Sequence, residues 1–251
     1  HLNYKTETTY DENGQNPLAS TISYYFDNEQ HFQQTRTETT NSKGQLVSTT
    51  MQYPGDISGQ QVYTDMVSKN IITPVIQSTT EIINSPSPNT PLSEERVNYG
   101  NAGNNNFVPV SVQKAVKGST LETEGTIDAY DGGGNILQFT NKAGIVSAII
   151  WGYNYRYPVA SIVGTTYTNA VAQLTGGTVT ALQSMDGATL RNELNKIRTN
   201  LPEARITSYT YKPMAGVTSI TDPNNKTNTY TYDSFNQLLT ILDQDNNVVK
   251  K

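Results

Sequence analysis

An aromatic run near the middle of the chain could stack against sugar rings. Its aromatic residues occur at every second position: Trp151, Tyr153, Tyr155 and Tyr157. In one extended strand such residues lie on the same face, and a row of rings on one face could bind flat sugar rings. The same row could instead form an aromatic ladder that holds the register of a sheet. The sequence leaves both interpretations open, so all four are candidate ligand-stacking residues.

Residue patterns that could perform catalysis are few. Glu122 and Glu124 would share one face of a strand, as a glycosidase pair requires, but exposed strand charges also protect sheet edges from aggregation. Ser23, Asp27 and His31 contain the residue types of a hydrolase triad. We interpret His31 instead as an exposed strand histidine. We therefore expect no catalytic residues and no enzymatic activity.

Two loops have part of a ligand-binding pattern. Asp243, Asp245 and Asn247 have the opening spacing of a calcium loop, without its glycine at the sixth position. The glycines at 132–134 lack the Lys-Ser/Thr pair and the helix of a phosphate-binding loop. We interpret the first loop as a turn and the second as a hairpin tip. The sequence predicts no metal site and no cofactor.

The composition excludes several classes of function. The chain contains no cysteine, so disulfides, thiolate nucleophiles and cysteine-bound metals are excluded, and its histidines are His1 and His31. The net charge of −5 argues against a nucleic-acid partner, which requires a basic surface. No apolar run is long enough to span a membrane, so we expect no membrane insertion by this segment. We expect the chain to be a piece of a longer polypeptide.

The residue types that dominate the chain favour strands and turns. It has 35 threonines, 26 asparagines and 16 tyrosines, and threonine and tyrosine suit a pleated surface while asparagine suits tight turns. We predict a mainly β fold, an antiparallel sheet of hairpin repeats that is open or partial in this piece. Residues 1–83 would hold hairpins and a short helix near 62–70, and residues 84–109 would form Pro- and Asn-rich loops around one short strand. Residues 110–251 would continue the repeat sheet within one continuous architecture.

A small helical insert is predicted at 168–200. Its apolar residues fall on one helical face: Leu190, Leu194, Ile197 and Leu201. Asp186 is an N-cap candidate and Pro202 follows as a stop. The charged residues of this helix lie off the apolar stripe: Arg191, Glu193, Lys196 and Arg198. We expect the apolar face to cover a patch of the sheet.

Internal similarity is the strongest pattern in the sequence. Tyr232 follows Tyr211 by 21 residues, and the same spacing separates matched acidic and turn-forming residues. Two weaker copies begin at Tyr130 and Tyr10. Each unit would be two strands and two turns, with turn residues that tolerate a left-handed backbone. The repeat-signature residues are Tyr10, Asp11, Gly14, Tyr130, Asp131, Gly134, Tyr211, Asp222, Asn225, Tyr232, Asp233, Asn236, Asp243 and Asn246.

These copies resemble the RHS/YD-repeat family, whose unit reads Tyr-Asp-x-x-Gly-Arg-Leu. The stretch 150–160, Ile-Trp-Gly-Tyr-Asn-Tyr-Arg-Tyr-Pro-Val-Ala, together with the following helical insert, is similar to the large RHS surface or secreted proteins of Bacteroidetes. The chain departs from the family pattern in three ways. The arginine is replaced by Gln15, Asn135 or Gln237, the glycine is replaced by Asn236 in one copy, and the copy that begins at Tyr211 lacks the aspartate.

The resemblance implies a non-catalytic scaffold or shell segment of a large bacterial protein. That protein would be secreted or held at the cell surface, and would carry or encapsulate an effector, such as a toxin, that is not present in this chain. The implied partners are the remainder of the same polypeptide, a secretion or outer-membrane machinery and cell-surface molecules. A carbohydrate-binding or adhesion module is an alternative function, and a glycan-active enzyme is a second alternative.

Overall fold

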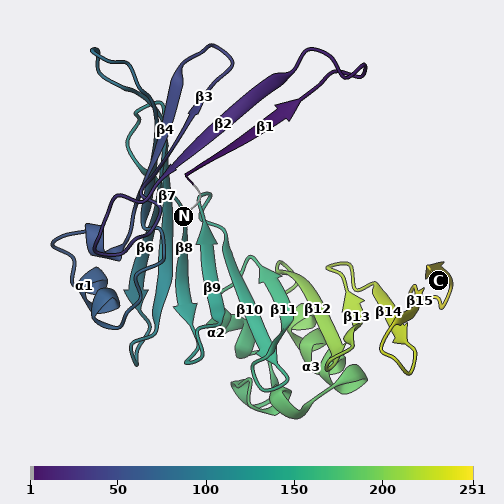
Figure 1. The fold of residues 1–251 in the computed structure, drawn as a ribbon. Helices are drawn as coiled ribbons and strands as arrows, with labels where there is room; N and C mark the ends of the chain where they lie inside the picture. Colours follow the sequence, from purple (N-terminus) through teal and green to yellow (C-terminus); the bar gives the residue numbers. More distant parts are fainter. Residues whose placement is uncertain (1–2, 251) are drawn as a thin grey trace. The chain divides into compact units, whose positions relative to one another are not determined.

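The protein is mainly β, as the sequence predicts. The computed structural model describes residues 3–250. Within this range, sixteen strands are hydrogen-bonded to their neighbours in the order in which they follow along the chain, from β1 to β16 (Figure 1). The registers between them are antiparallel, as in a series of hairpins. The chain divides into two compact units, residues 1–126 and 127–251, which we describe in turn.

The first unit contains the longest strands and one short helix. Its strands are β1 (Tyr4–Thr9), β2 (Leu18–Tyr25), β3 (Arg36–Thr40), β4 (Leu46–Gln52), β5 (Gln77–Ile82), β6 (Thr90–Asn101), β7 (Phe107–Val116) and the start of β8 (Glu122–Tyr130). A 3-10 turn, η1 (Pro54–Asp56), and the helix α1 (Gln61–Ser68) lie between β4 and β5. The helix confirms the prediction for residues 62–70. Tyr63 and Met66 of α1 are buried with Ile76 in a small core.

Two expectations for the first unit are wrong. Residues 90–101 form β6, which pairs with β5 and β7, so region 84–109 is not mainly loop. Pro86 and Pro88 lie in the loop between β5 and β6, and Pro91 is accommodated because it stands at a register shift between these strands. His31 lies in a turn between β2 and β3 and is buried rather than exposed on a strand. Its burial follows from contacts with η1, which sequence spacing does not reveal.

The second unit combines a hairpin sheet with the predicted helical insert. Its strands are the end of β8, β9 (Ile136–Asn141), β10 (Val146–Gly152), β11 (Tyr157–Val163), β12 (Arg205–Lys212), β13 (Gly216–Thr221), β14 (Thr227–Tyr232), β15 (Leu238–Leu242) and β16 (Val248–Lys250). The insert, between β11 and β12, contains α2 (Tyr167–Val171), η2 (Thr175–Gly177), η3 (Ala181–Ser184) and α3 (Gly187–Asn200). Asp186 occupies the N-cap position of α3, but its side chain makes no capping hydrogen bond.

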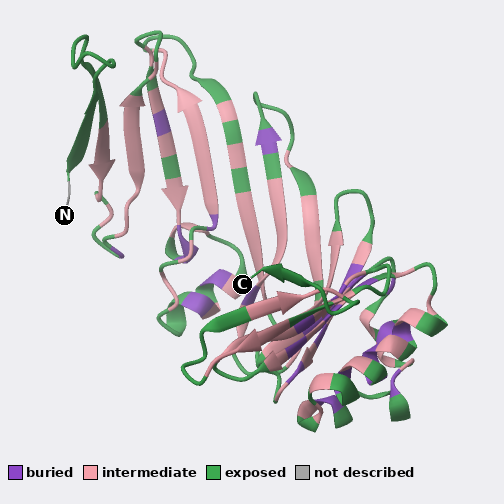
Figure 2. Cartoon of the chain, turned by 90° about the vertical axis from the view of Figure 1, so that its right-hand side faces the viewer, coloured by how far each residue is buried: buried purple, intermediate pink, exposed green. Residues whose placement is uncertain are grey.

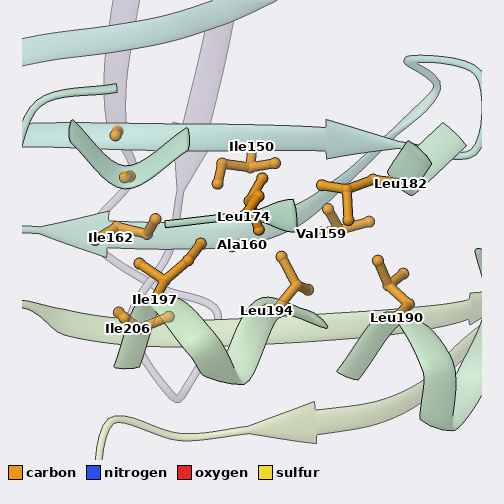
Figure 3. Close-up of a cluster of buried hydrophobic side chains, with 12 residues drawn as sticks. Ile150, Val159, Ala160, Ile162, Leu174, Leu182, Leu190, Leu194, Ile197 and Ile206 are labelled. Atoms are coloured by element: carbon orange, nitrogen blue, oxygen red, sulfur yellow. The ribbon is translucent and has the colours of Figure 1, made fainter. Parts of the chain in front are cut away.

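The main core of the second unit lies between the insert and strands β10 to β12. Leu190, Leu194 and Ile197 of α3 are fully buried (Figure 3), as their spacing predicts. They belong to the same cluster as Ile150 of β10 and Ile206 of β12. The burial colours of Figure 2 show the insert with a buried face and an exposed face. Non-polar burial of this size is the largest stabilising contribution available to the unit.

A buried acid links two parts of the insert. Glu193 is only 8% exposed although it lies off the apolar stripe of α3. Its Oε1 accepts a hydrogen bond from the amide of Thr175 at 2.6 Å, and its Oε2 accepts one from Lys196 at 2.8 Å. Burial opposes ionisation, but these hydrogen bonds outweigh it and hold the pKa of Glu193 below its usual value. The ionised carboxylate therefore fixes η2 on α3.

We expect Leu194→Asp to lower the free energy of unfolding of the second unit by about 4 kcal/mol, because it places an unpaired charge in the core. Urea denaturation can be followed by the fluorescence of Trp151, the single tryptophan, which lies on β10. Thr189→Asp is the matched control, because Thr189 is exposed in the first turn of α3, where an acid is tolerated. An unchanged urea midpoint for Leu194→Asp would contradict docking of α3 on the sheet.

Candidate functional site

The repeat-signature acids form one recurrent turn. In each copy the side-chain Oδ1 of the first residue accepts hydrogen bonds from the backbone amides two and four positions later, as an Asx turn does. In the copy that starts at Asp233, these distances are 2.9 Å to Phe235 and 2.8 Å to Gln237. The described chain contains seven such turns, beginning at Asp11, Asn41, Asp131, Asn141, Asp222, Asp233 and Asp243.

The fourth residue of each turn has a left-handed backbone. In four copies it is glycine, as at Gly14 and Gly134, with φ of 70° and 88°. In the last three copies it is asparagine, as at Asn225 and Asn236, with φ of 62° and 61°. Asparagine tolerates this conformation better than other non-glycine residues, which explains the departure from the glycine of the family pattern. The Tyr-Asp signature does not identify the copy from Asn41 to Gly44, which makes the same turn with Thr40 and asparagine at those two positions.

An aromatic side chain at the repeat start donates to a backbone carbonyl of the preceding strand. The hydroxyl of Tyr232 donates to the carbonyl of Val217 at 2.9 Å. The hydroxyl of Tyr211 donates equivalently to the carbonyl of Pro158, also at 2.9 Å. The two tyrosines thus have matching environments. A register shift also immediately precedes each of them, between β12 and β13 and between β14 and β15.

Trp151 takes the place of a repeat tyrosine. It follows Tyr130 by 21 residues, the separation of Tyr232 from Tyr211. Its indole Nε1 donates to the carbonyl of Ile136 on β9 at 2.8 Å, and a register shift precedes it. Tryptophan supplies the same combination of ring and donor as tyrosine. Tyr10, in contrast, is 61% exposed and lies beyond the end of β1.

The aromatic run does not lie on one strand. Trp151 belongs to β10 and Tyr157 to β11, and a hairpin turn with positive φ at Tyr153, Asn154 and Tyr155 joins the strands. A left-handed backbone is uncommon for tyrosine, so alternation in the sequence does not indicate this turn. The expectation of four rings on one strand face is therefore wrong.

Three tyrosines form a compact cluster instead. The ring of Tyr157 stacks on that of Tyr211, with centroids 4.8 Å apart, and Tyr153 meets both rings edge-on. The hydroxyl of Tyr153 also accepts a hydrogen bond from the amide of Tyr211 at 2.8 Å. Burial raises the pKa of Tyr211 to about 12, so its phenol is neutral at ordinary pH and can donate to Pro158. The cluster fixes the β10–β11 hairpin against β12.

Tyr155 is the exception, because it lines a hollow of about 650 Å³. The other residues that line the hollow are Asp131, Gly132, Gly133, Asn135 and Asn154. The backbone of Tyr155 is held on both sides: Gln183 accepts from its amide at 2.9 Å, and Asn135 donates to its carbonyl at 3.0 Å. The residue as a whole remains 44% exposed. An exposed tyrosine on a fixed backbone could stack on a sugar, and the neighbouring carboxylate and amide groups could hydrogen-bond the sugar hydroxyls.

Asp27 and His31 have separate partners. His31 Nε2 lies 3.3 Å from Asp56, and its Nδ1 accepts from the amide of Gln33 at 3.0 Å. Asp27 accepts a hydrogen bond from the Thr35 hydroxyl instead of pairing with His31. His1 lies outside the described residues. Glu122 and Glu124 lie two positions apart on β8.

The calcium-like loop is one of the repeat turns. Asp243 Oδ1 accepts from the amides of Asp245 and Asn247, and its Oδ2 accepts from the Asn247 side chain. These hydrogen bonds, the Asn247 side chain first, lower the pKa of Asp243. Among residues 3–250, no group of three or more acids and histidines is arranged to hold a metal ion. No helix in this range has the length and apolar character needed to cross a membrane.

Solved structures with weak similarity to this chain include a toxin complex. No protein-family model matches the sequence, and no curated protein matches it. One similar structure is described as "Crystal Structure of TcdB2-TccC3 without hypervariable C-terminal region", with 12% identity and a TM-score of 0.39. Another is a Tc holotoxin pore of Photorhabdus luminescens, with 13% identity and a TM-score of 0.40. Each covers 94% of this chain, which spans only 13% and 12% of those chains.

The approach of Tyr232 to Gly216 offers a test of the repeat geometry. Gly216 has a φ of 148°, and a β-carbon there would collide with the Tyr232 hydroxyl. We expect Gly216→Ala to lower the free energy of unfolding by about 2 kcal/mol and Tyr232→Phe by about 1 kcal/mol. The double variant should lose less than the sum, because phenylalanine lacks the hydroxyl that collides.

Urea denaturation followed by Trp151 fluorescence measures this cycle. Gly132→Ala is the control, because a β-carbon there meets no atom within 4 Å and the backbone needs no left-handed conformation. Strictly additive losses would contradict the close approach of the phenol to Gly216.

Proposed function

We propose that this chain is a structural segment of the scaffold or shell of a large RHS/YD-repeat protein. The observation that carries the proposal is the pairing of two recurrent features. Asx turns mark the hairpin ends, and an aromatic donor bonds the preceding strand, as at Tyr211 and Tyr232. A hairpin of this size is only marginally stable alone, so such units gain stability by adding to a sheet. This repetition favours construction of a wall over presentation of one catalytic centre.

The proposal includes the setting of the segment. The remainder of the same polypeptide would be its main partner, with an effector held elsewhere in that polypeptide. A bacterial protein of this kind would be secreted or exposed at the cell surface, where a secretion or outer-membrane machinery and surface molecules of other cells become its partners. The net charge of −5 favours neither nucleic acid nor anionic membrane as a partner.

Electron cryomicroscopy of the complete natural polypeptide tests this proposal. We expect the strands of residues 127–251 to appear as consecutive strands of a larger sheet, with β16 hydrogen-bonded along its outer edge to further hairpins of the same polypeptide. A chain that forms a separate domain, with β16 unpaired and no shared sheet, would contradict the scaffold role.

A second candidate function is binding of a neutral glycan at the hollow beside Tyr155. The specific observation is that hydrogen bonds with Asn135 and Gln183 fix the Tyr155 backbone while the residue stays exposed. Asp131 and Asn154 would supply hydrogen-bonding groups at the rim of the hollow. A glycan-active enzyme has less support, because none of the three hollows described in residues 3–250 is lined by two carboxylates.

A glycan array with the complete chain tests the second candidate. Tyr155→Ala removes the stacking ring and should lower the affinity for any glycan that the chain binds about tenfold. Tyr10→Ala, which removes an exposed tyrosine from the first unit, should leave that affinity unchanged. An array without binding, or binding that survives Tyr155→Ala, would remove this candidate and leave the scaffold proposal unaffected.

A further inference from the structure

A second hollow lies between one face of α3 and the β13–β14 hairpin. Its volume is about 240 Å³, and the residues that line it are Arg191, Asn192, Asn195, Arg198, Thr221, Asn225 and Thr227. Arg191 and Arg198 are seven residues apart, which places their α-carbons about 10 Å apart along the helix. Long arginine side chains can converge on one ligand across that distance. This face of α3 is distinct from the apolar face of Leu190, Leu194 and Ile197.

Arg191 keeps most of its hydrogen-bonding capacity unused. A guanidinium carries five N–H donors. Arg191 is half-buried, and its hydrogen bond to a protein atom runs from Nη1 to the Ser219 hydroxyl at 3.0 Å. Ser219 is itself buried and hydrogen-bonded to Thr210 at 2.6 Å. The guanidinium is therefore anchored at one nitrogen while its other donors are free for a ligand.

Arg198 has a buried donor with no partner. Its Nη2 donates to the carbonyls of Ile206 at 3.0 Å and Asp222 at 3.1 Å, and its Nη1 donates to Asn195 at 2.8 Å. Its Nε is buried and has no hydrogen-bond partner. An unsatisfied buried donor on a charged group is destabilising. Burial accordingly lowers the pKa of Arg198.

The residues that line the hollow carry positive charge, and none of them is acidic. One carboxylate lies close to this lining: the charge of Asp222 acts on Arg198, and its Oδ1 accepts from the amides of Asn224 and Lys226 in its own turn. Two guanidinium groups in a confined polar space favour an anion, because their charges are less screened there than in water.

We propose that this hollow binds a small oxyanion of the phosphate class, held by Arg191 and Arg198. Arginine forks match phosphate oxygens in pairs, and the side-chain amides of Asn192 and Asn195 can supply further donors. A tetrahedral oxyanion offers more acceptor oxygens than a carboxylate and fits this larger set of donors. The available volume exceeds that of several waters, at about 30 Å³ each, so it admits a phosphate group. Binding would join the helical insert to the β13–β14 hairpin.

Nuclear magnetic resonance of the arginine Nε–Hε groups in the complete chain, titrated with inorganic phosphate, tests the proposal. We expect saturable shifts for Arg191 and Arg198 and none for Arg205, which is exposed at the start of β12. Chloride at matched ionic strength should give no saturable shift. Arg191→Gln should weaken phosphate binding about tenfold, because it removes charge-assisted hydrogen bonds, and Arg205→Gln should leave binding unchanged.

Two controls make the outcome decisive. Trp151 fluorescence reports whether Arg191→Gln is folded. If it is not, Arg191→Lys keeps the charge but removes the fork, and weaker phosphate binding is still expected. Sulfate should compete with phosphate, and acetate should bind more weakly. Shifts that do not saturate, acetate that binds as tightly as phosphate, or a folded Arg191 variant with unchanged affinity would each overturn the proposal.

Discussion

The hydrogen bond from an aromatic side chain to the carbonyl of the preceding strand is the interaction on which the repeat depends. Regular pairing between β13 and β14 ends at Ser219 and Thr229, two residues short of Val217. A backbone carbonyl beyond the last paired residues still needs a donor. Tyr232 supplies it from the side chain, and Trp151 does the same for Ile136. Strands can therefore separate toward one hairpin end, where the next turn begins, without losing a hydrogen bond.

The sequence predicts the fold well where the determining contacts are local. Spacing alone indicates the acids of the turns and the buried face of α3, because an Asx turn and a helix are both set by residues a few positions apart. Hydrogen-bonding groups identify the repeat copies better than residue types do. Trp151 and Asn41 escape the repeat alignment, although each supplies the same hydrogen bond as the tyrosine or aspartate of other copies. A search by donor and acceptor type would have found both.

Long-range contacts account for what the sequence does not predict. The left-handed backbone at Tyr153 and Tyr155 is unfavourable locally, and it is held by Tyr211 and Gln183, which are distant in sequence. The burial of His31 likewise depends on Asp56, across a strand pair. No periodicity in the sequence could report either contact. The hollow beside Arg191 and the one beside Tyr155 both arise where the insert or a turn meets a hairpin, so neither is visible as a motif.

The helical insert resolves a weakness of a hairpin repeat. Strands rich in threonine bury little apolar area, and their cross-strand hydrogen bonds, such as Thr231 to Thr240, add only about 1 kcal/mol each. Near β15 both Leu238 and Leu239 remain exposed, so the repeat alone provides no deep core there. The apolar face of α3 supplies such a core for β10 to β12. The stability of the second unit therefore falls from the insert toward β16, and hydrogen exchange should be slowest in β11 and fastest in β16.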